Sequence, residues 1–149
     1  MATILIATDG SPEAREAVDY GLDLAAAQHA RAVLLHVVPP VDWTRLDRGS
    51  TVKPLPEAIH LKEALALDDA ASKAAERGVE FSREVVAGDP ADEIVAYADS
   101  IEADLTVLGS RHRGPLAGAL LGSVSRAVLH ESRRPVLIVP SRSAAAVPR

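Results

Sequence analysis

A chain of 149 residues, 48% of them hydrophobic and 25% charged, has the length and composition of one globular domain. Its net charge of −5 argues against nucleic-acid binding, which depends largely on lysine and arginine side chains that neutralise phosphates. Because the chain has no cysteine, disulfides, thiolate catalysis and cysteine-bound metals are excluded.

The first half of the chain predicts a strand, a helix, a second strand and a long loop. Residues 3–8 form an apolar run with little alternation, as in a parallel strand that is covered on both faces. This run is too short for a signal peptide or a membrane span, so we expect a cytoplasmic protein without membrane contact. Ser11 can cap, and a proline can begin, a helix over 12–29. A second buried strand is expected at 32–38, and the four prolines in 39–56 indicate an irregular loop.

The second half predicts three more helices and three more strands. Gly78 is placed to end one helix, and Asp89, which precedes a proline, is placed to cap the next. The helices are expected at 57–77, 90–100 and 124–132, and the strands at 80–86, 105–108 and 136–139. We expect one domain over 1–140 and a flexible C-terminal tail over 141–149.

Five strands joined by helical crossovers predict an α/β fold, a doubly wound five-stranded parallel sheet with helices on both faces. Ligands of such sheets bind beyond the carboxyl ends of the strands, where the strand order reverses. Three segments lie at these ends: Ala7-Thr8-Asp9, Val37-Val38 and Leu108-Gly109. If the first and fourth strands are neighbours, the three segments converge on one crevice.

A segment rich in glycine and hydroxyl groups follows the fourth strand. It begins with Gly109-Ser110-Arg111-His112-Arg113-Gly114 and continues, where a helix should open, with Gly122-Ser123-Val124-Ser125. Exposed backbone N–H groups beside glycines and at the start of a helix bind anions, of which phosphate is the most common. Five arginines and one acidic residue lie between residues 109 and 135, which fits an anion site and equally fits a solvated basic surface.

Single residues of the crevice each have a functional and a structural interpretation. Asp9 is suited to ribose hydroxyls or a divalent cation, while an Asp-Gly pair is also ordinary turn chemistry. Val37 can offer its backbone to an adenine edge, or it can simply pack in the core. Ser123 can donate to phosphate or cap the helix, and the two roles are compatible.

Several well-known sites are absent from the sequence. No lysine follows Lys73, so a Gly-Lys-Ser/Thr phosphate loop is missing there, and neither a dinucleotide-binding glycine motif nor a Gly-x-Ser-x-Gly elbow is present. The histidines lack the spacing of metal ligands, and His112 alone is placed by the sequence in the crevice. They are His29, His36, His60, His112 and His130.

Taken together, these segments resemble the universal stress protein family in its single-domain, ATP-binding form, and the resemblance extends from Thr3 to Pro140. It implies a Rossmann-like fold of the adenine nucleotide alpha hydrolase type. The segments that carry it are Ile6-Ala7-Thr8-Asp9-Gly10-Ser11, Leu35-His36-Val37, Gly88-Asp89-Pro90, Leu108-Gly109-Ser110-Arg111, Leu121-Gly122-Ser123-Val124-Ser125 and Pro135-Val136-Leu137-Ile138-Val139.

The resemblance implies an ATP-binding regulatory protein of the stress response, with slow or no hydrolysis. It also implies a regulatory protein partner, whose identity the resemblance does not give. Asp9 would meet the ribose or an ATP-bound Mg²⁺, Val37 the adenine, and the glycine and hydroxyl residues the phosphates. A homodimer would form through the last strand, Val136, Leu137, Ile138 and Val139, an apolar edge. The residues expected to bind the nucleotide are Ala7, Thr8, Asp9, Val37, Leu108, Gly109, Arg111, His112, Gly122, Ser123, Val124 and Ser125.

The family's ATP-binding members are similar in a spacing of Gly, two residues, Gly, nine residues and Gly-Ser/Thr. Gly109 and Gly122-Ser123 match it here, but His112 stands at the middle glycine. A histidine there either obstructs the approach of the phosphates or donates a hydrogen bond to them. Two alternatives to the regulatory function follow: a nucleotide-free interaction module closed by His112, and a weak nucleotide hydrolase or adenylyl-transfer enzyme that uses its imidazole.

Overall fold

The computed structural model describes residues 1–38, 65–110 and 121–141 of the chain. Several expectations lie outside these ranges, namely the loop over 39–56, the first part of the helix over 57–77, Arg111 and His112, and most of the tail. Within the described helices, none is long and apolar enough to cross a membrane.

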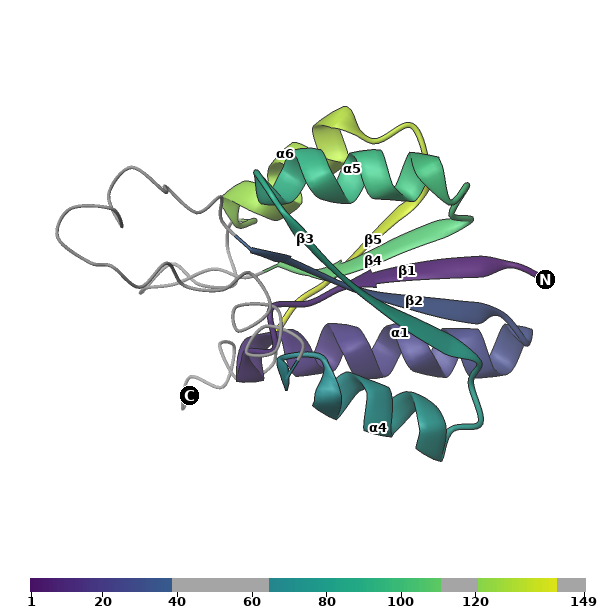
Figure 1. Ribbon diagram of the computed structural model, residues 1–149. Helices are drawn as coiled ribbons and strands as arrows, with labels where there is room; N and C mark the ends of the chain where they lie inside the picture. Colours follow the sequence, from purple (N-terminus) through teal and green to yellow (C-terminus); the bar gives the residue numbers. More distant parts are fainter. Residues whose placement is uncertain (39–64, 111–120, 142–149) are drawn as a thin grey trace, which may run out of the picture.

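The strands and helices alternate along the chain as expected (Figure 1). The five strands are β1 (Thr3–Ala7), β2 (Arg31–Val38), β3 (Phe81–Ala87), β4 (Leu105–Gly109) and β5 (Val136–Val139). The helices are the short 3₁₀ turn η1 (Pro12–Ala14), α1 (Arg15–Gln28), α4 (Asp68–Glu76), α5 (Pro90–Ser100) and α6 (Ser123–Glu131).

All five strands are parallel and lie in the order β3-β2-β1-β4-β5, which confirms the doubly wound sheet. The chain first builds outward from β1 to β2 and β3, and then returns to add β4 on the other side of β1. The strand order therefore reverses between β1 and β4. This is the arrangement that leaves a crevice at the carboxyl ends of the central strands.

Helices cover both faces of the sheet, α1 and α4 on one side and α5 and α6 on the other (Figure 1). In β1, Ile4 and Ile6 pack on the side of α1 and α4, whereas Leu5 packs with Ile94 of α5 and Val128 of α6. Because alternate side chains enter two separate apolar cores, the strand shows little polar alternation in its sequence.

Two helix boundaries, the start of α5 and the end of α4, lie where the local sequence predicts them. Asp89 caps α5 by accepting a hydrogen bond from the backbone N–H of Asp92 at 3.1 Å. Gly78 follows the last residues of α4 with a φ of +66°, the left-handed conformation that glycine adopts at low cost. Both predictions are confirmed.

The capping expected of two serines is confirmed in position for one and wrong for the other. Ser11 is the N-cap residue of η1, but its hydroxyl makes no capping hydrogen bond, and its carbonyl accepts the N–H of Ala14 at 3.1 Å. At α6 the N-cap residue is Gly122, and Ser123 is already the first helical residue. Neither residue therefore satisfies the start of its helix with its side chain.

The described part of the helix expected over 57–77 is interrupted: Leu65 is helical, a turn follows at Ala66 and Leu67, and α4 begins at Asp68. Gly10, with a φ of +77°, lies directly against this turn. A Cβ atom at Gly10 would be 2.8 Å from the Ala66 carbonyl oxygen, so only glycine fits there without displacement. The segment after β1 is thereby packed closely onto the entry to α4.

Candidate functional site

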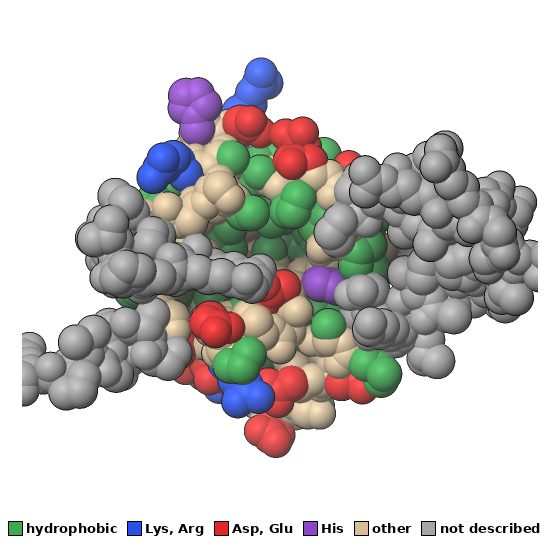
Figure 2. All heavy atoms as spheres, turned by 90° about the vertical axis from the view of Figure 1, so that its left-hand side faces the viewer, with side chains coloured by type: hydrophobic (Ala, Val, Ile, Leu, Met, Phe, Trp, Pro, Cys, Tyr) green, Lys and Arg blue, Asp and Glu red, His purple; other side chains and the backbone are tan. Residues whose placement is uncertain are grey.

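A pocket lies at the carboxyl ends of β1, β2 and β4, where the strand order reverses. Figure 2 shows this side of the molecule, where hydrophobic side chains line a hollow and acidic side chains lie beside it. The enclosed space measures about 140 Å³. Pockets that enclose a whole small ligand hold roughly 300–1,000 Å³, so a nucleotide would extend beyond the described walls.

The structure brings together the residues expected at the three strand ends. Those that line the pocket are Ala7, Thr8, Asp9, Val37, Leu108, Gly109 and Val124. Gly122, Ser123 and Ser125 lie at the start of α6, outside the lining, while Arg111 and His112 lie outside the described residues. The convergence depends on the pairing of β1 with β4, which places Ile6 opposite Val107.

Other lining residues escaped the sequence analysis. They are Ser11, Glu13, Ala14, Leu35, His36, Pro90 and Ile94. Three belong to the turn and first helix after β1, and Pro90 and Ile94 lie one helical turn apart at the start of α5. For these turn and helix residues the topology was the only available signal, because helices that begin at the carboxyl edge of the sheet direct their first turns at the crevice.

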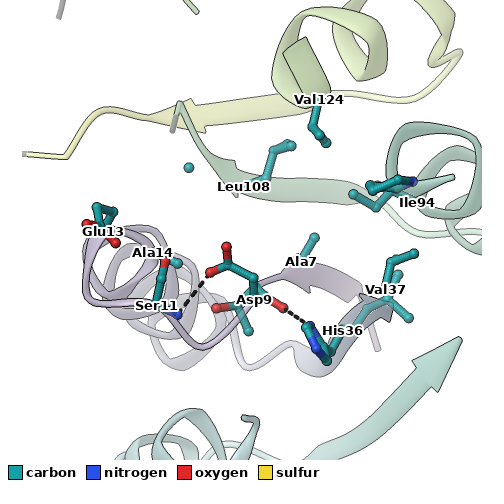
Figure 3. Close-up of a pocket in the computed structure, with 14 residues that line it drawn as sticks. Ala7, Asp9, Ser11, Glu13, Ala14, His36, Val37, Ile94, Leu108 and Val124 are labelled. Atoms are coloured by element: carbon teal, nitrogen blue, oxygen red, sulfur yellow. Dashed lines mark hydrogen bonds between the residues drawn. The ribbon is translucent and has the colours of Figure 1, made fainter. Parts of the chain in front are cut away.

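The turn after β1 holds Asp9 by backbone hydrogen bonds. Asp9 Oδ1 accepts the N–H of Ser11 at 2.9 Å, and Thr8 Oγ1 accepts the N–H of Gly10 at 3.1 Å. Figure 3 shows the Asp9 carboxylate directed toward the middle of the pocket, facing Leu108 across it. The turn role of Asp9 is compatible with the expected binding role, since the turn leaves the carboxylate directed into the pocket.

The backbone of Val37 faces the open end of β1. Thr8 N donates to Leu35 O at 2.9 Å, so the carbonyl of Leu35 points toward β1. Backbone groups two residues apart in a strand point to the same side, and those of Val37 therefore also point toward β1. The strand β1 ends at Ala7, opposite Leu35, and does not extend along Val37.

The start of α6 is tied to the end of β4. Gly122 N donates to Ser110 O at 2.8 Å, and Ser110 N donates to Val139 O at 3.0 Å. Ser125, a residue that is 2% exposed, has its hydroxyl within hydrogen-bond distance of two carbonyl oxygens, Gly122 O at 3.0 Å and Ser110 O at 3.4 Å. Its one hydrogen is donated to one of these carbonyls, so in this arrangement Ser125 offers an anion its backbone N–H.

The charged side chains of the described lining are both acidic, Asp9 and Glu13. Among the described residues, the N-terminus of α6, which has no side-chain cap, contributes positive potential beside this lining. Within residues 1–38, 65–110 and 121–141, no group of three or more histidine and carboxylate side chains is arranged to hold a metal ion.

Comparisons with known proteins agree with the fold. The chain is 37% identical over 146 residues to the Universal stress protein YxiE of Bacillus subtilis, covering 91% of this chain and 97% of that protein. It is 32% identical over 136 residues to the Universal stress protein MJ0531 of Methanocaldococcus jannaschii, covering 91% of this chain and 80% of that protein.

Among solved structures, the fold is similar to a universal stress protein in complex with cAMP, with a TM-score of 0.72 and 30% identity. This similarity covers 93% of the present chain and 96% of the other. The model of the Universal stress protein family matches residues 1–140, which include every described strand and helix. The chain belongs to the Universal stress protein family.

Proposed function

We propose that this protein is an ATP-binding regulator of the stress response that holds ATP and hydrolyses it slowly or not at all. The observation that carries the proposal is that two features adjoin one apolar pocket. They are the edge of β2 at Val37, along which β1 does not extend, and the first turn of α6, which has no side-chain cap and from which Val124 lines the pocket. The first suits the edge of a base and the second suits phosphate. A cytoplasmic location, where ATP is abundant, goes with this proposal.

The base would lie against Val37. Adenine presents a donor and an acceptor side by side, and the C=O and N–H of one strand residue match that pair. The neighbouring walls are apolar and come from both sides of the pocket, including Ala7, Ile94 and Leu108. Such a site combines a few directional polar groups with a hydrophobic enclosure, as is typical of small-ligand pockets.

The ribose and the phosphates would extend toward Asp9 and α6. The carboxylate of Asp9 accepts hydrogen bonds from hydroxyl groups, and with phosphate oxygens it would also ligate Mg²⁺. The backbone N–H groups of Ser123 and Val124, at the positive end of α6, would face phosphate oxygens. Because Asp9 and Glu13 are both acidic, Mg²⁺ bound to ATP would reduce the repulsion between the lining and the phosphates.

The solved relative with cAMP supports an adenine nucleotide as the class of ligand. We expect ATP to be held rather than turned over. The titratable side chains of the described lining are Asp9, Glu13 and His36. Nδ1 of His36 is bonded to the Thr8 carbonyl, and we assign no general base to attack on the γ-phosphate.

A homodimer through β5 is part of the proposal. The two edges of the sheet differ: β3 carries the exposed charged residues Arg83 and Glu84, whereas all four residues of β5 are apolar and half-buried. Charges on an edge oppose pairing with another chain, and an apolar edge favours it. Pairing of β5 with its copy would bury this edge in a two-fold interface.

Binding is tested by gentle purification, chromatography of any released nucleotide, and calorimetric titration of the emptied protein with Mg²⁺-ATP. The proposal predicts ATP in the extract or saturable binding afterwards. No ATP in either measurement would refute it. If the natural protein fails to bind and a His112→Gly variant binds, the interaction module closed by His112 is favoured instead. Steady release of ADP or AMP that His112→Ala abolishes would favour the enzyme.

A further inference from the structure

His36 is a buried histidine at the pocket with a partner on a different strand. It lies on β2 between Leu35 and Val37, and its residue is 6% exposed. Its Nδ1 is 3.0 Å from the backbone carbonyl oxygen of Thr8, 28 residues away in the chain (Figure 3). Because a carbonyl only accepts hydrogen bonds, Nδ1 carries the hydrogen and donates it.

This bond extends the connection between β1 and β2 past the last backbone pair. The N–H of Thr8 donates to Leu35 O at 2.9 Å, and the C=O of the same residue accepts from His36. Thr8, itself 8% exposed, is thus held at both of its backbone polar groups by consecutive residues of β2. The peptide plane between Thr8 and Asp9 is therefore fixed in direction.

This fixed peptide group immediately precedes the Cα atom that bears the Asp9 side chain. Side chains alternate along β2, so the imidazole of His36 departs from the face opposite Leu35 and Val37, and Figure 3 shows it beside the turn that carries Asp9. A single side chain thereby connects the strand that bears Val37 to the turn that bears Asp9.

We propose that His36 is a positioning residue for the nucleotide: its Nδ1–H, bonded to the Thr8 carbonyl, sets the distance between the base-binding backbone of Val37 and the ribose-binding carboxylate of Asp9. The inference rests on the proposed nucleotide-binding function. His36 touches no nucleotide atom in this role and acts only through the Thr8–Asp9 peptide. No other described donor bonds the Thr8 carbonyl.

Two variants of similar size separate the hydrogen bond from the volume of the ring. In His36→Asn, the amide nitrogen stands at the same number of bonds from Cα as Nδ1 and can donate to Thr8 O. In His36→Leu, a methyl group occupies that position and the carbonyl is left unsatisfied. His130→Leu, which removes an exposed histidine near the end of α6, is the control for loss of a histidine elsewhere.

The affinity for Mg²⁺-ATP is measured by calorimetry for the natural protein and the three variants, with circular dichroism to verify folding. A net hydrogen bond corresponds to roughly a three- to tenfold change in affinity. We expect Kd to rise by about that factor in His36→Leu, to stay within about twofold in His36→Asn, and to be unchanged in His130→Leu. Equal affinity of the Leu variant and the natural protein, or equal weakening in Asn and Leu, would overturn the inference.

A second measurement does not depend on the variants. Long-range proton–nitrogen correlation spectra of the natural protein report which ring nitrogen of His36 is protonated. We expect a proton on Nδ1, and a neutral ring with its only proton on Nε2 would overturn the inference even if the Leu variant does not fold. Failure of the natural protein to bind ATP would instead refute the proposed function, so the two failures are distinguishable.

Discussion

Replacing Val37 by proline removes the one backbone donor that we assign to the adenine base. The N–H of Val37 points toward the side on which β1 has already ended, so its loss costs no bond to β3. The ring of proline is tolerated at such an edge position of a strand. The variant is therefore expected to fold and to bind ATP less well.

The expected size of the effect is that of one hydrogen bond. A neutral hydrogen bond contributes about 0.5–1.5 kcal/mol net, and about 1.4 kcal/mol corresponds to a factor of ten in Kd. We therefore expect Kd for ATP to rise roughly three- to tenfold in Val37→Pro. The preference for ATP over GTP should shrink as well, because the N–H that matches the acceptor of the adenine edge is missing.

The assay is calorimetric titration with ATP and GTP, combined with thermal unfolding. Val37→Ala keeps the N–H and controls for the side chain. Val38→Pro is the neighbouring control, since Val38 faces β3, where its carbonyl accepts from Gly88 N at 2.9 Å. That variant should lose stability because proline removes a bond of the β2–β3 ladder. A folded Val37→Pro protein with natural affinity and selectivity for ATP would refute the reasoning.

Three further changes test other parts of the structure. Asp9→Asn keeps the turn acceptor but loses the charge, so we expect natural stability with about tenfold weaker Mg²⁺-ATP binding by calorimetry, while equal affinity would contradict the role of the carboxylate. Gly10→Ala should lower the free energy of unfolding in urea by about 1–3 kcal/mol because of its positive φ and the contact with Ala66, and an unchanged midpoint would contradict this. Because Val139 O faces β4, the N–H of the preceding residue, Ile138, points to the open side of β5, and Ile138→Pro removes it. This variant should sediment as a monomer and the control Ile138→Val as a dimer, while a dimeric Pro variant would exclude pairing through β5.

The order and type of the elements could be predicted from the sequence because their signals are local. Asp89 before a proline and Gly78 after an alanine-rich helix each act on neighbouring backbone groups, and the structure has both. The continuous apolar character of the strands indicated that helices cover both faces of the sheet. The pairing of β1 with β4 was assumed and not predicted from the sequence, because packing between segments far apart in the chain decides which strands become neighbours.

The errors have equally specific causes. Ser11 has the residue type of a cap and occupies the N-cap position, but its hydroxyl makes no capping hydrogen bond. Ser123 also has the residue type of a cap, but α6 begins one residue earlier than expected, so its N-cap is Gly122. His36 was missed because a single histidine in an apolar strand has no local signature, and its partner, Thr8, lies on another strand. Tertiary partners of this kind cannot be predicted from spacing alone.

The central claim is that the pocket between β1, β2 and β4 binds ATP. Calorimetric titration of the nucleotide-free natural protein with Mg²⁺-ATP tests it most directly, with GTP as the matched competitor. The account predicts saturable binding of one ATP per chain and clearly weaker binding of GTP. No heat of binding with ATP, or equal affinity for the two nucleotides, would contradict it.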